Sequence, residues 1–211
     1  LCSVALEQGL STVALCDHDT TRGIARFCRA GRCLGIKALG GVEMSAEWPS
    51  GNCHIVGLGV APGYRPLEKT LEQIRDSRDG RNGRIVEKLN AAGVAITMEE
   101  VAAVTGGEVV GRPHMARVMV SKGFAATVQE AFDKYLAKGA VAYVDRYRLE
   151  PCGAVSLLKK SGAMVILAHP SQLGIDAERL DLLVEELMTQ GLDGIEVYTP
   201  YASDEQLAEY E

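Results

Sequence analysis

The chain has 211 residues, of which 47% are hydrophobic, and a formal net charge of −6. This size and composition allow one large domain, or a domain with an insertion, around a substantial apolar core. No apolar run reaches the roughly 18 residues of a membrane-spanning helix, and the start shows no signal-peptide pattern, so we expect a cytoplasmic protein. An acidic chain of this kind is not expected to form a stable nucleic-acid complex by coating phosphates.

The cysteines show no C-x-x-C pair, and several lie in apolar runs. This pattern favours reduced thiols over a disulfide framework or a zinc-thiolate site. Cys16 and Cys53 adjoin the polar motifs described below. We interpret them as packing residues, because the sequence positions no base beside either thiol.

The first part of the chain, residues 1–64, alternates helix and strand. Residues 12–16 form a short apolar run that predicts a buried strand. A helix over residues 22–34 follows, with Asp19 or Thr20 as its expected cap.

A second extended stretch covers residues 36–45, and we expect Gly40 and Gly41 to break it. A turn separates it from a strand over residues 53–59. Short connections between helices and strands are typical of an α/β fold.

The middle part, residues 65–150, is slightly basic, whereas the rest of the chain is acidic. Its apolar spacing predicts helices, with Gly80 and Gly83 weakening the first of them. Two capping boxes and one proline mark further helix starts: Thr97 with Glu100, Thr127 with Glu130, and Pro113. Four arginines are expected to form a solvated helix face: Arg75, Arg78, Arg81 and Arg84.

The α/β alternation returns in residues 151–211. Apolar runs predict two strands and three helices: strands at 163–168 and 194–198, and helices at 154–160, at 180–188 and from Ser203. We interpret the middle part as a helical subdomain inserted between two parts of one α/β domain, 1–64 and 151–211.

Polar side chains gather where the predicted strands end or begin. His18 and His169 each follow a strand, His54 begins another, and Glu43 lies in an extended stretch. Imidazole nitrogens and a carboxylate are ligands for zinc, manganese or iron, and the carboxylate can bridge two ions. The alternative is that each histidine is structural, and that the aspartates around His18 are turn and cap residues. Taken together, the four residues favour a metal site.

Six short motifs carry a resemblance to a known family. They are ALCDHDT at 14–20, GVEMS at 41–45, HIVGLG at 54–59, GRPHM at 111–115, LAHP at 167–170 and GIEVY at 194–198. The chain resembles the PHP (polymerase and histidinol phosphatase) domain, and GRPH within a helical insertion resembles its branch acting on 3′,5′-nucleotide bisphosphates and on 5′ ends of short RNA.

The resemblance implies a distorted β/α barrel, a metal-dependent phosphoesterase activity and up to three divalent ions, whether manganese, zinc or iron. It implies that His18, Glu43, His54 and His169 are metal ligands, with Glu43 as the bridge. Asp17 would orient His18, or else serve as a turn residue. No catalytic group beyond metal-bound water is implied, and Glu196 is interpreted as a strand residue near the site.

Two motifs of the family are missing: an early H-x-H strand and a late D-x-H segment. We therefore interpret the chain as an internal fragment of a longer protein, whose site would be incomplete by itself.

Arg112 and His114 open the predicted insertion helix, where free N–H groups and a guanidinium suit a second phosphate. The alternatives are a surface ion pair for Arg112 and a polar first-turn residue for His114. The substrate is expected to be a small nucleotide or short RNA. Other readings are a histidinol phosphate phosphatase, a polymerase-linked exonuclease, or a metal-binding module without catalysis.

Overall fold

The computed structural model describes residues 1–49, 52–61, 63–106 and 110–210. They divide into two compact units: residues 1–73 with 148–211, and residues 74–147. Helix α3 (Arg65–Ala91) begins in the first unit and continues into the second. The assignment of domains at 65 and 150 stays a prediction.

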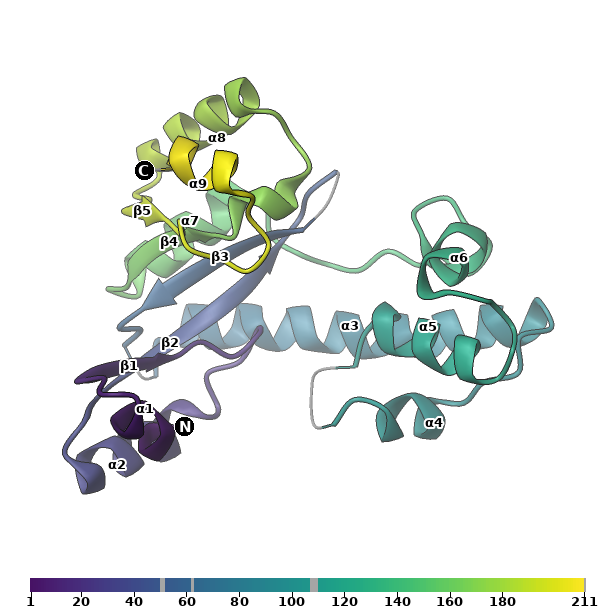
Figure 1. Cartoon of the computed structure of the whole chain (residues 1–211), viewed down its shortest axis with the longest axis horizontal. Coiled ribbons are helices and arrows are strands. Elements are labelled where there is room, and N and C mark those ends of the chain that lie inside the picture. The colour runs from purple at the N-terminus through teal and green to yellow at the C-terminus, as the bar shows by residue number, and fades with distance from the viewer. Residues whose placement is uncertain (50–51, 62, 107–109, 211) are drawn as a thin grey trace. The chain divides into compact units, whose positions relative to one another are not determined.

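The first unit contains a five-stranded mixed sheet in the order β1-β2-β3-β4-β5 (Figure 1). Strands β1 and β2 run parallel, as do β4 and β5, whereas β3 is antiparallel to both of its neighbours. The strands are β1 (Thr12–Leu15), β2 (Lys37–Ala46), β3 (Cys53–Leu58), β4 (Met164–Ala168) and β5 (Gly194–Ile195). The α/β prediction is confirmed, although β5 is shorter than the predicted 194–198.

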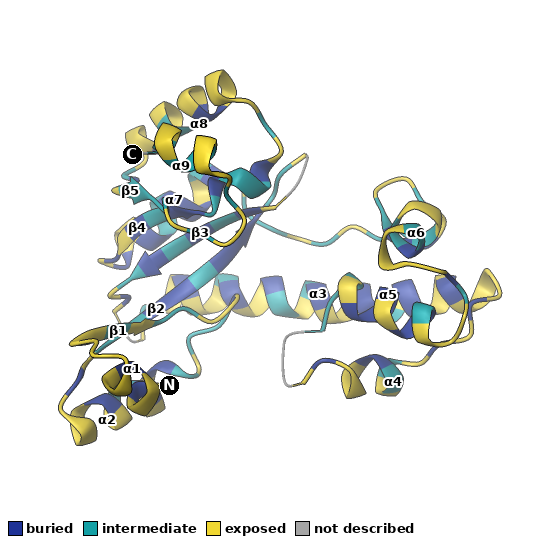
Figure 2. Cartoon of the chain, in the orientation of Figure 1, coloured by how far each residue is buried: buried dark blue, intermediate teal, exposed yellow. Residues whose placement is uncertain are grey.

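Helices α1 (Cys2–Glu7), α2 (Ile24–Leu34), α7 (Pro151–Lys160), α8 (Ala177–Thr189) and α9 (Asp204–Tyr210) complete this unit, with a short 3-10 turn at Pro170–Leu173. Strands β2 and β3 are largely buried in Figure 2, because their alternate residues face apolar side chains of the core. In the part of the chain that the structure describes, no helix has the length and apolarity to cross a bilayer.

The predicted break at Gly40 and Gly41 is wrong, because β2 passes through both residues. The glycines instead permit close approach of neighbouring elements. A Cβ at Gly40 would lie 2.4 Å from Ile24 Cγ2, and one at Gly41 would lie 2.6 Å from Cys16 Sγ. The sequence showed the glycines but not the neighbours that require them.

The predicted cap of the second helix is also wrong. Helix α2 begins after Gly23, and no side chain caps it. Thr20 Oγ1 accepts a hydrogen bond from Arg22 N, before the helix starts. Asp19 is fully buried and bonds to β2 instead.

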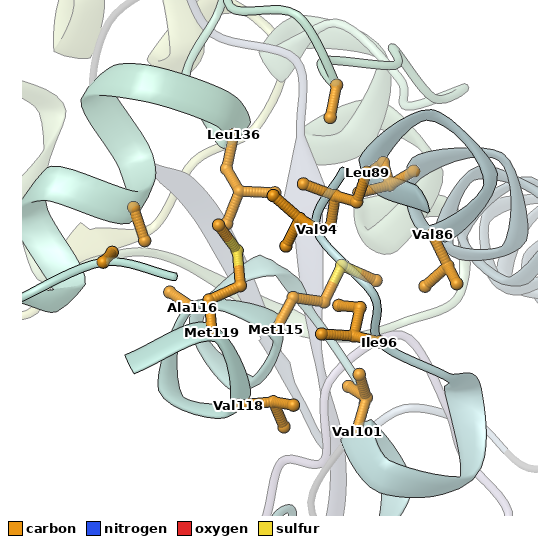
Figure 3. Close-up of a cluster of buried hydrophobic side chains, with 14 residues drawn as sticks. Val86, Leu89, Val94, Ile96, Val101, Met115, Ala116, Val118, Met119 and Leu136 are labelled. Atoms are coloured by element: carbon orange, nitrogen blue, oxygen red, sulfur yellow. The ribbon is translucent and has the colours of Figure 1, made fainter. Parts of the chain in front are cut away.

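The second unit is helical and has its own apolar core (Figure 3). Its elements are the C-terminal part of α3, α4 (Met98–Ala103), α5 (Arg112–Ser121), α6 (Val128–Ala131) and a π-helical turn at Phe132–Leu136. Figure 3 shows Leu89 of α3, Met115 and Met119 of α5, and Leu136 pointing toward one another. Burying such large side chains contributes roughly 1.5–3 kcal/mol each.

The predicted helix starts are confirmed in this unit. Thr97 and Glu100 form a reciprocal capping box. Thr127 Oγ1 accepts from Glu130 N, and the Glu130 carboxylate accepts from the N–H of Ala126. Pro113 lies in the first turn of α5, as predicted.

Helix α3 is continuous through Gly80 and Gly83, and their weakening of it, by roughly 1 kcal/mol for each glycine, stays a prediction. The predicted arginine face is wrong. Arg78 and Arg81 are buried, so the arginines do not form a solvated face. Arg81 donates from Nε and Nη2 to Asn82 Oδ1. Part of the arginine series therefore lies inside the second unit.

Candidate metal centre

His18 reaches the sheet because the segment after β1 continues along β2. His18 and Glu43 form an isolated parallel bridge. Glu43 N donates to the carbonyl of Asp17, and Asp19 N donates to the carbonyl of Glu43. The end of β1 is therefore held against β2 on both sides of His18.

Asp19 fixes this loop from inside. It has a left-handed backbone, with φ +52°, which non-glycine residues adopt rarely and aspartate more readily than most. Its Oδ1 accepts from Ser45 N at 2.8 Å, and its Oδ2 accepts from Ser45 Oγ at 3.0 Å. The loop that carries His18 is thus tied to β2 two residues beyond Glu43.

Strand register places His54 beside Glu43. His54 pairs with Ser45 of β2, and side chains two apart on a strand share a face. His54 is therefore a diagonal neighbour of Glu43 on that face. On the other side His54 pairs with Ala168, directly before His169.

His169 leaves the end of β4 with a left-handed backbone, φ +29° and ψ +64°. This conformation turns its side chain toward β2 and β3. Its Nε2 lies 3.2 Å from Glu43 Oε1 and 3.0 Å from His54 Nδ1. The histidines come from separate elements, as the sequence analysis predicted from their positions at strand ends.

Glu43 is the centre of the cluster. Its Oε1 lies 2.8 Å from His54 Nδ1, and its Oε2 lies 3.6 Å from His18 Nε2. The imidazole rings of His18 and His54 meet edge to face, as do those of His54 and His169. One carboxylate thus faces three imidazoles.

The surroundings perturb two of these groups. Burial would raise the pKa of Glu43, but hydrogen bonds with His169 and His54 and the charge of His18 hold it well below its usual range. Burial would lower the pKa of His169, but the hydrogen bond and charge of Glu43 raise it. In the metal-free protein this arrangement favours an ionised carboxylate among imidazoles.

The donor set fits a divalent cation. Ligand atoms of His18, Glu43 and His54 all lie within 4.8 Å of one another. The ring nitrogens of His54 and His169 face each other at 3.0 Å, where only one proton can lie between them. Lone pairs that converge in this way suit a metal ion that prefers nitrogen and oxygen ligands.

A cavity of about 350 Å³ opens beside the cluster. It is lined by Cys16, Glu43, His169, Glu196 and apolar residues of β3 and β4. Burial, with smaller effects of Glu43 and Asp17, raises the pKa of Cys16 to about 11. Burial alone raises that of Cys53 to about 12, so both thiols stay protonated at neutral pH.

The remaining predicted residues lie apart from the cluster or beside it. The Asp17 carboxylate is close to Gly23 at the start of α2, since a Cβ on that glycine would lie 2.8 Å from Oδ2. Arg112 donates to Leu136 O, and its guanidinium lies over the Phe132 and Tyr143 rings.

His114 is buried and accepts from Gly111 N through Nδ1, which caps the first turn of α5. Arg112 and His114 belong to the second unit, and the histidine cluster belongs to the first. The structure therefore describes each group separately.

The sequence does not predict the contacts of two carboxyl groups at the cluster. Asp19 is expected as a helix cap, whereas it anchors Ser45. Glu196 lies near the site, as expected, but it follows β5 rather than lying in it, and its Oε2 accepts the backbone N–H of His169 at 2.9 Å. Both bonds join residues more than 25 positions apart, so local pattern gives no signal for them.

Comparison with known proteins finds relatives that match most of the chain. It is 33% identical over 197 residues to the 5′-3′ exoribonuclease Rnm of Salmonella typhimurium, covering 92% of this chain and 67% of that protein. It is also 33% identical over 186 residues to the 3′,5′-nucleoside bisphosphate phosphatase of Chromobacterium violaceum, covering 88% and 65%. No family model matches the sequence.

Solved structures resemble this fold closely. An amidohydrolase from Chromobacterium violaceum with bound sulfate and no metal has a TM-score of 0.84 at 30% identity, over 99% of this chain and 74% of that one. A proposed metal-dependent phosphoesterase from Bifidobacterium adolescentis has a TM-score of 0.79 at 27% identity, with the same coverage. The α/β barrel prediction is confirmed by these neighbours.

Proposed function

Because the chain belongs to the PHP family of metal-dependent phosphoesterases, we propose that it hydrolyses 3′,5′-nucleotide bisphosphates or the 5′ ends of short RNA. The chain is a hydrolase that acts on phosphate esters of nucleotides. The relatives that support this are named as an exoribonuclease and a nucleoside bisphosphate phosphatase.

The observation that carries the proposal is the convergence of three imidazoles on one carboxylate. His18, His54 and His169 would hold divalent cations, with Glu43 between them. Manganese, zinc and iron all suit these ligands, and the complete protein would bind up to three ions. Bound ions supply charge compensation for the phosphate oxygens and lower the pKa of water.

The chain's own residues position the reaction. Phosphoryl transfer depends mainly on placing the ester and compensating its charge, so rigid ligands matter more than a catalytic side chain. Asp19 and Ser45 hold the loop of His18, while the β2–β3–β4 register aligns Glu43 and His54. The proposal includes Asp17 as a residue that orients His18.

Arg112 and His114 are the proposed contacts for the second phosphate. A guanidinium fork matches phosphate oxygens, and His114 holds the turn that presents Arg112. Changing Arg112 to Ala should raise KM for bisphosphates far more than for simple phosphate esters. Arg117→Ala, on an exposed position of the same helix, is the matched control. Equal effects of Arg112→Ala on both substrates would refute this role.

Tyr201 supports a nucleotide over a base-free ester. The residue is 63% exposed, and its ring meets the His169 ring edge to face with centroids 6.2 Å apart. An exposed aromatic face beside a phosphoesterase centre can stack on a nucleobase. Replacing Tyr201 with Ala should raise KM for a nucleoside bisphosphate but not for ribose bisphosphate, whereas Tyr201→Phe should leave both unchanged.

The direct test uses the natural protein, loaded with Mn²⁺, and three substrates: adenosine 3′,5′-bisphosphate, a short 5′-phosphorylated RNA and histidinol phosphate. We expect phosphate or nucleotide release from one of the first two, and its loss in Glu43→Gln. Preference for histidinol phosphate would place the protein elsewhere in the family. Metal binding without hydrolysis of any of them would identify a non-catalytic module.

A further inference from the structure

Glu196 makes a contact that metal binding by itself does not require. Its carboxylate Oε2 accepts a hydrogen bond of 2.9 Å from the backbone N–H of His169. Its own N–H donates to the carbonyl of Leu167, so the backbone of Glu196 is fixed beside β4. Glu196 therefore lies directly after β5, beside β4, and lines the same cavity as Glu43 and His169.

His169 needs such a contact because its backbone is strained. A non-glycine residue with φ +29° and ψ +64° is uncommon. The following Pro170 increases the cost, because its ring disfavours helical conformations for the preceding residue. Strained residues of this kind persist only where the surrounding structure fixes them.

The structure fixes His169 at three points. Glu196 takes its N–H, and Gln172 N donates to its carbonyl. Its ring Nε2 meets Glu43 and His54. The first contact is charge-assisted, and it acts on the backbone that sets the direction of the imidazole.

We infer that Glu196 is a positioning residue for the metal centre, which holds the backbone of His169 so that its Nε2 faces Glu43. This inference rests on the proposed function in assigning His169 as a metal ligand. Groups that orient metal ligands commonly contribute 10- to 100-fold to metal affinity. Glu196 would thereby set how tightly the site binds a divalent ion, without being a ligand itself.

Metal affinity of the natural protein tests this inference. Titration of metal-free protein with Mn²⁺ by calorimetry should show about 10- to 100-fold weaker binding for Glu196→Ala. Glu196→Gln keeps an oxygen that can accept the His169 N–H, and it should stay within a few fold of the unchanged protein. Glu185→Ala removes the same side chain from an exposed position of α8, and it should have no effect.

Hydrolysis at saturating Mn²⁺ separates positioning from folding. Glu196→Ala should recover most of its kcat when metal is in excess, and its thermal unfolding should remain cooperative. Equal loss of affinity in Glu196→Ala and Glu196→Gln would overturn the inference, because it would show that the charge acts directly. Unchanged affinity in both would overturn it as well.

Failure of the proposed function would give results different from failure of the role inferred for Glu196. If the unchanged protein binds Mn²⁺ but hydrolyses no nucleotide, the substrate is wrong while the affinity comparison still decides the role of Glu196. If Glu196→Ala fails to fold, Glu196→Asp gives a second measurement. Its shorter carboxylate should bind Mn²⁺ more weakly than Glu196→Gln does, since it cannot reach the His169 N–H, and equal affinity would overturn the inference.

Discussion

Asp19 gives the sharpest prediction, because the structure shows what its removal leaves behind. It is fully buried, and its two oxygens accept from the N–H and the hydroxyl of Ser45. Asp19→Ala would leave both donors buried without these acceptors, at about 1–3 kcal/mol each. The left-handed backbone at φ +52° adds no new clash, because aspartate and alanine both carry a Cβ. The expected loss of unfolding free energy is therefore about 2–6 kcal/mol.

Asp19→Asn is the informative companion. Asparagine tolerates a left-handed backbone, its amide oxygen can accept from Ser45 N, and its amide can donate to Ser45 Oγ. We expect a loss of only about 1–2 kcal/mol. Urea unfolding of the metal-free natural protein, followed by circular dichroism, measures both values. Asp181→Ala, at an exposed position of α8, controls for loss of an aspartate.

Two results would refute this reasoning. If Asp19→Ala costs less than about 1 kcal/mol, the paired hydrogen bonds do not stabilise the loop. If Asp19→Asn and Asp19→Ala cost the same, then the hydrogen bonds that asparagine can keep with Ser45 do not stabilise the loop. Either outcome would remove the physical basis for the placement of His18.

Three further outcomes are expected. Thr97→Ala should lower the unfolding free energy by about 1 kcal/mol in urea titrations, because α4 loses its capping bond. Met115→Ala should cost about 2–5 kcal/mol, because it opens a cavity in the core of the second unit. At pH 8, iodoacetamide should label exposed Cys33 but not Cys16 or Cys53, whose raised pKa values of about 11 and 12 leave almost no thiolate until the pH approaches them. Mass spectrometry of labelled peptides measures this, and rapid labelling of Cys16 at pH 8 would contradict it.

Much of the fold follows from local pattern. The apolar runs predict β1, β3 and β4 within a residue or two, because buried strands need continuous or alternating apolar side chains. The capping box at Thr97 and Glu100 is equally local, since its two partners are three residues apart. These features require no knowledge of distant contacts.

The features that sequence analysis missed all depend on distant neighbours. Gly40 and Gly41 look like breakers, but Ile24 and Cys16 pack against them in the folded chain. Asp19 looks like a cap until its bonds to Ser45 are visible.

The metal centre could be predicted in part from the sequence. Strand ends predict that His18, His54 and His169 converge, because polar residues at the ends of neighbouring strands meet at one edge. The position of Glu43 among them follows from register, which a single sequence does not reveal. The left-handed turn at His169 and its bond to Glu196 were beyond local pattern altogether.

The most direct test of the account is to locate the metal. Crystals of the natural protein grown with Mn²⁺ should give an anomalous difference peak within about 2.0–2.3 Å of ligand atoms from Glu43 and at least two of His18, His54 and His169. A peak at another position, with these four side chains still in their metal-free hydrogen bonds at saturating Mn²⁺, would contradict it.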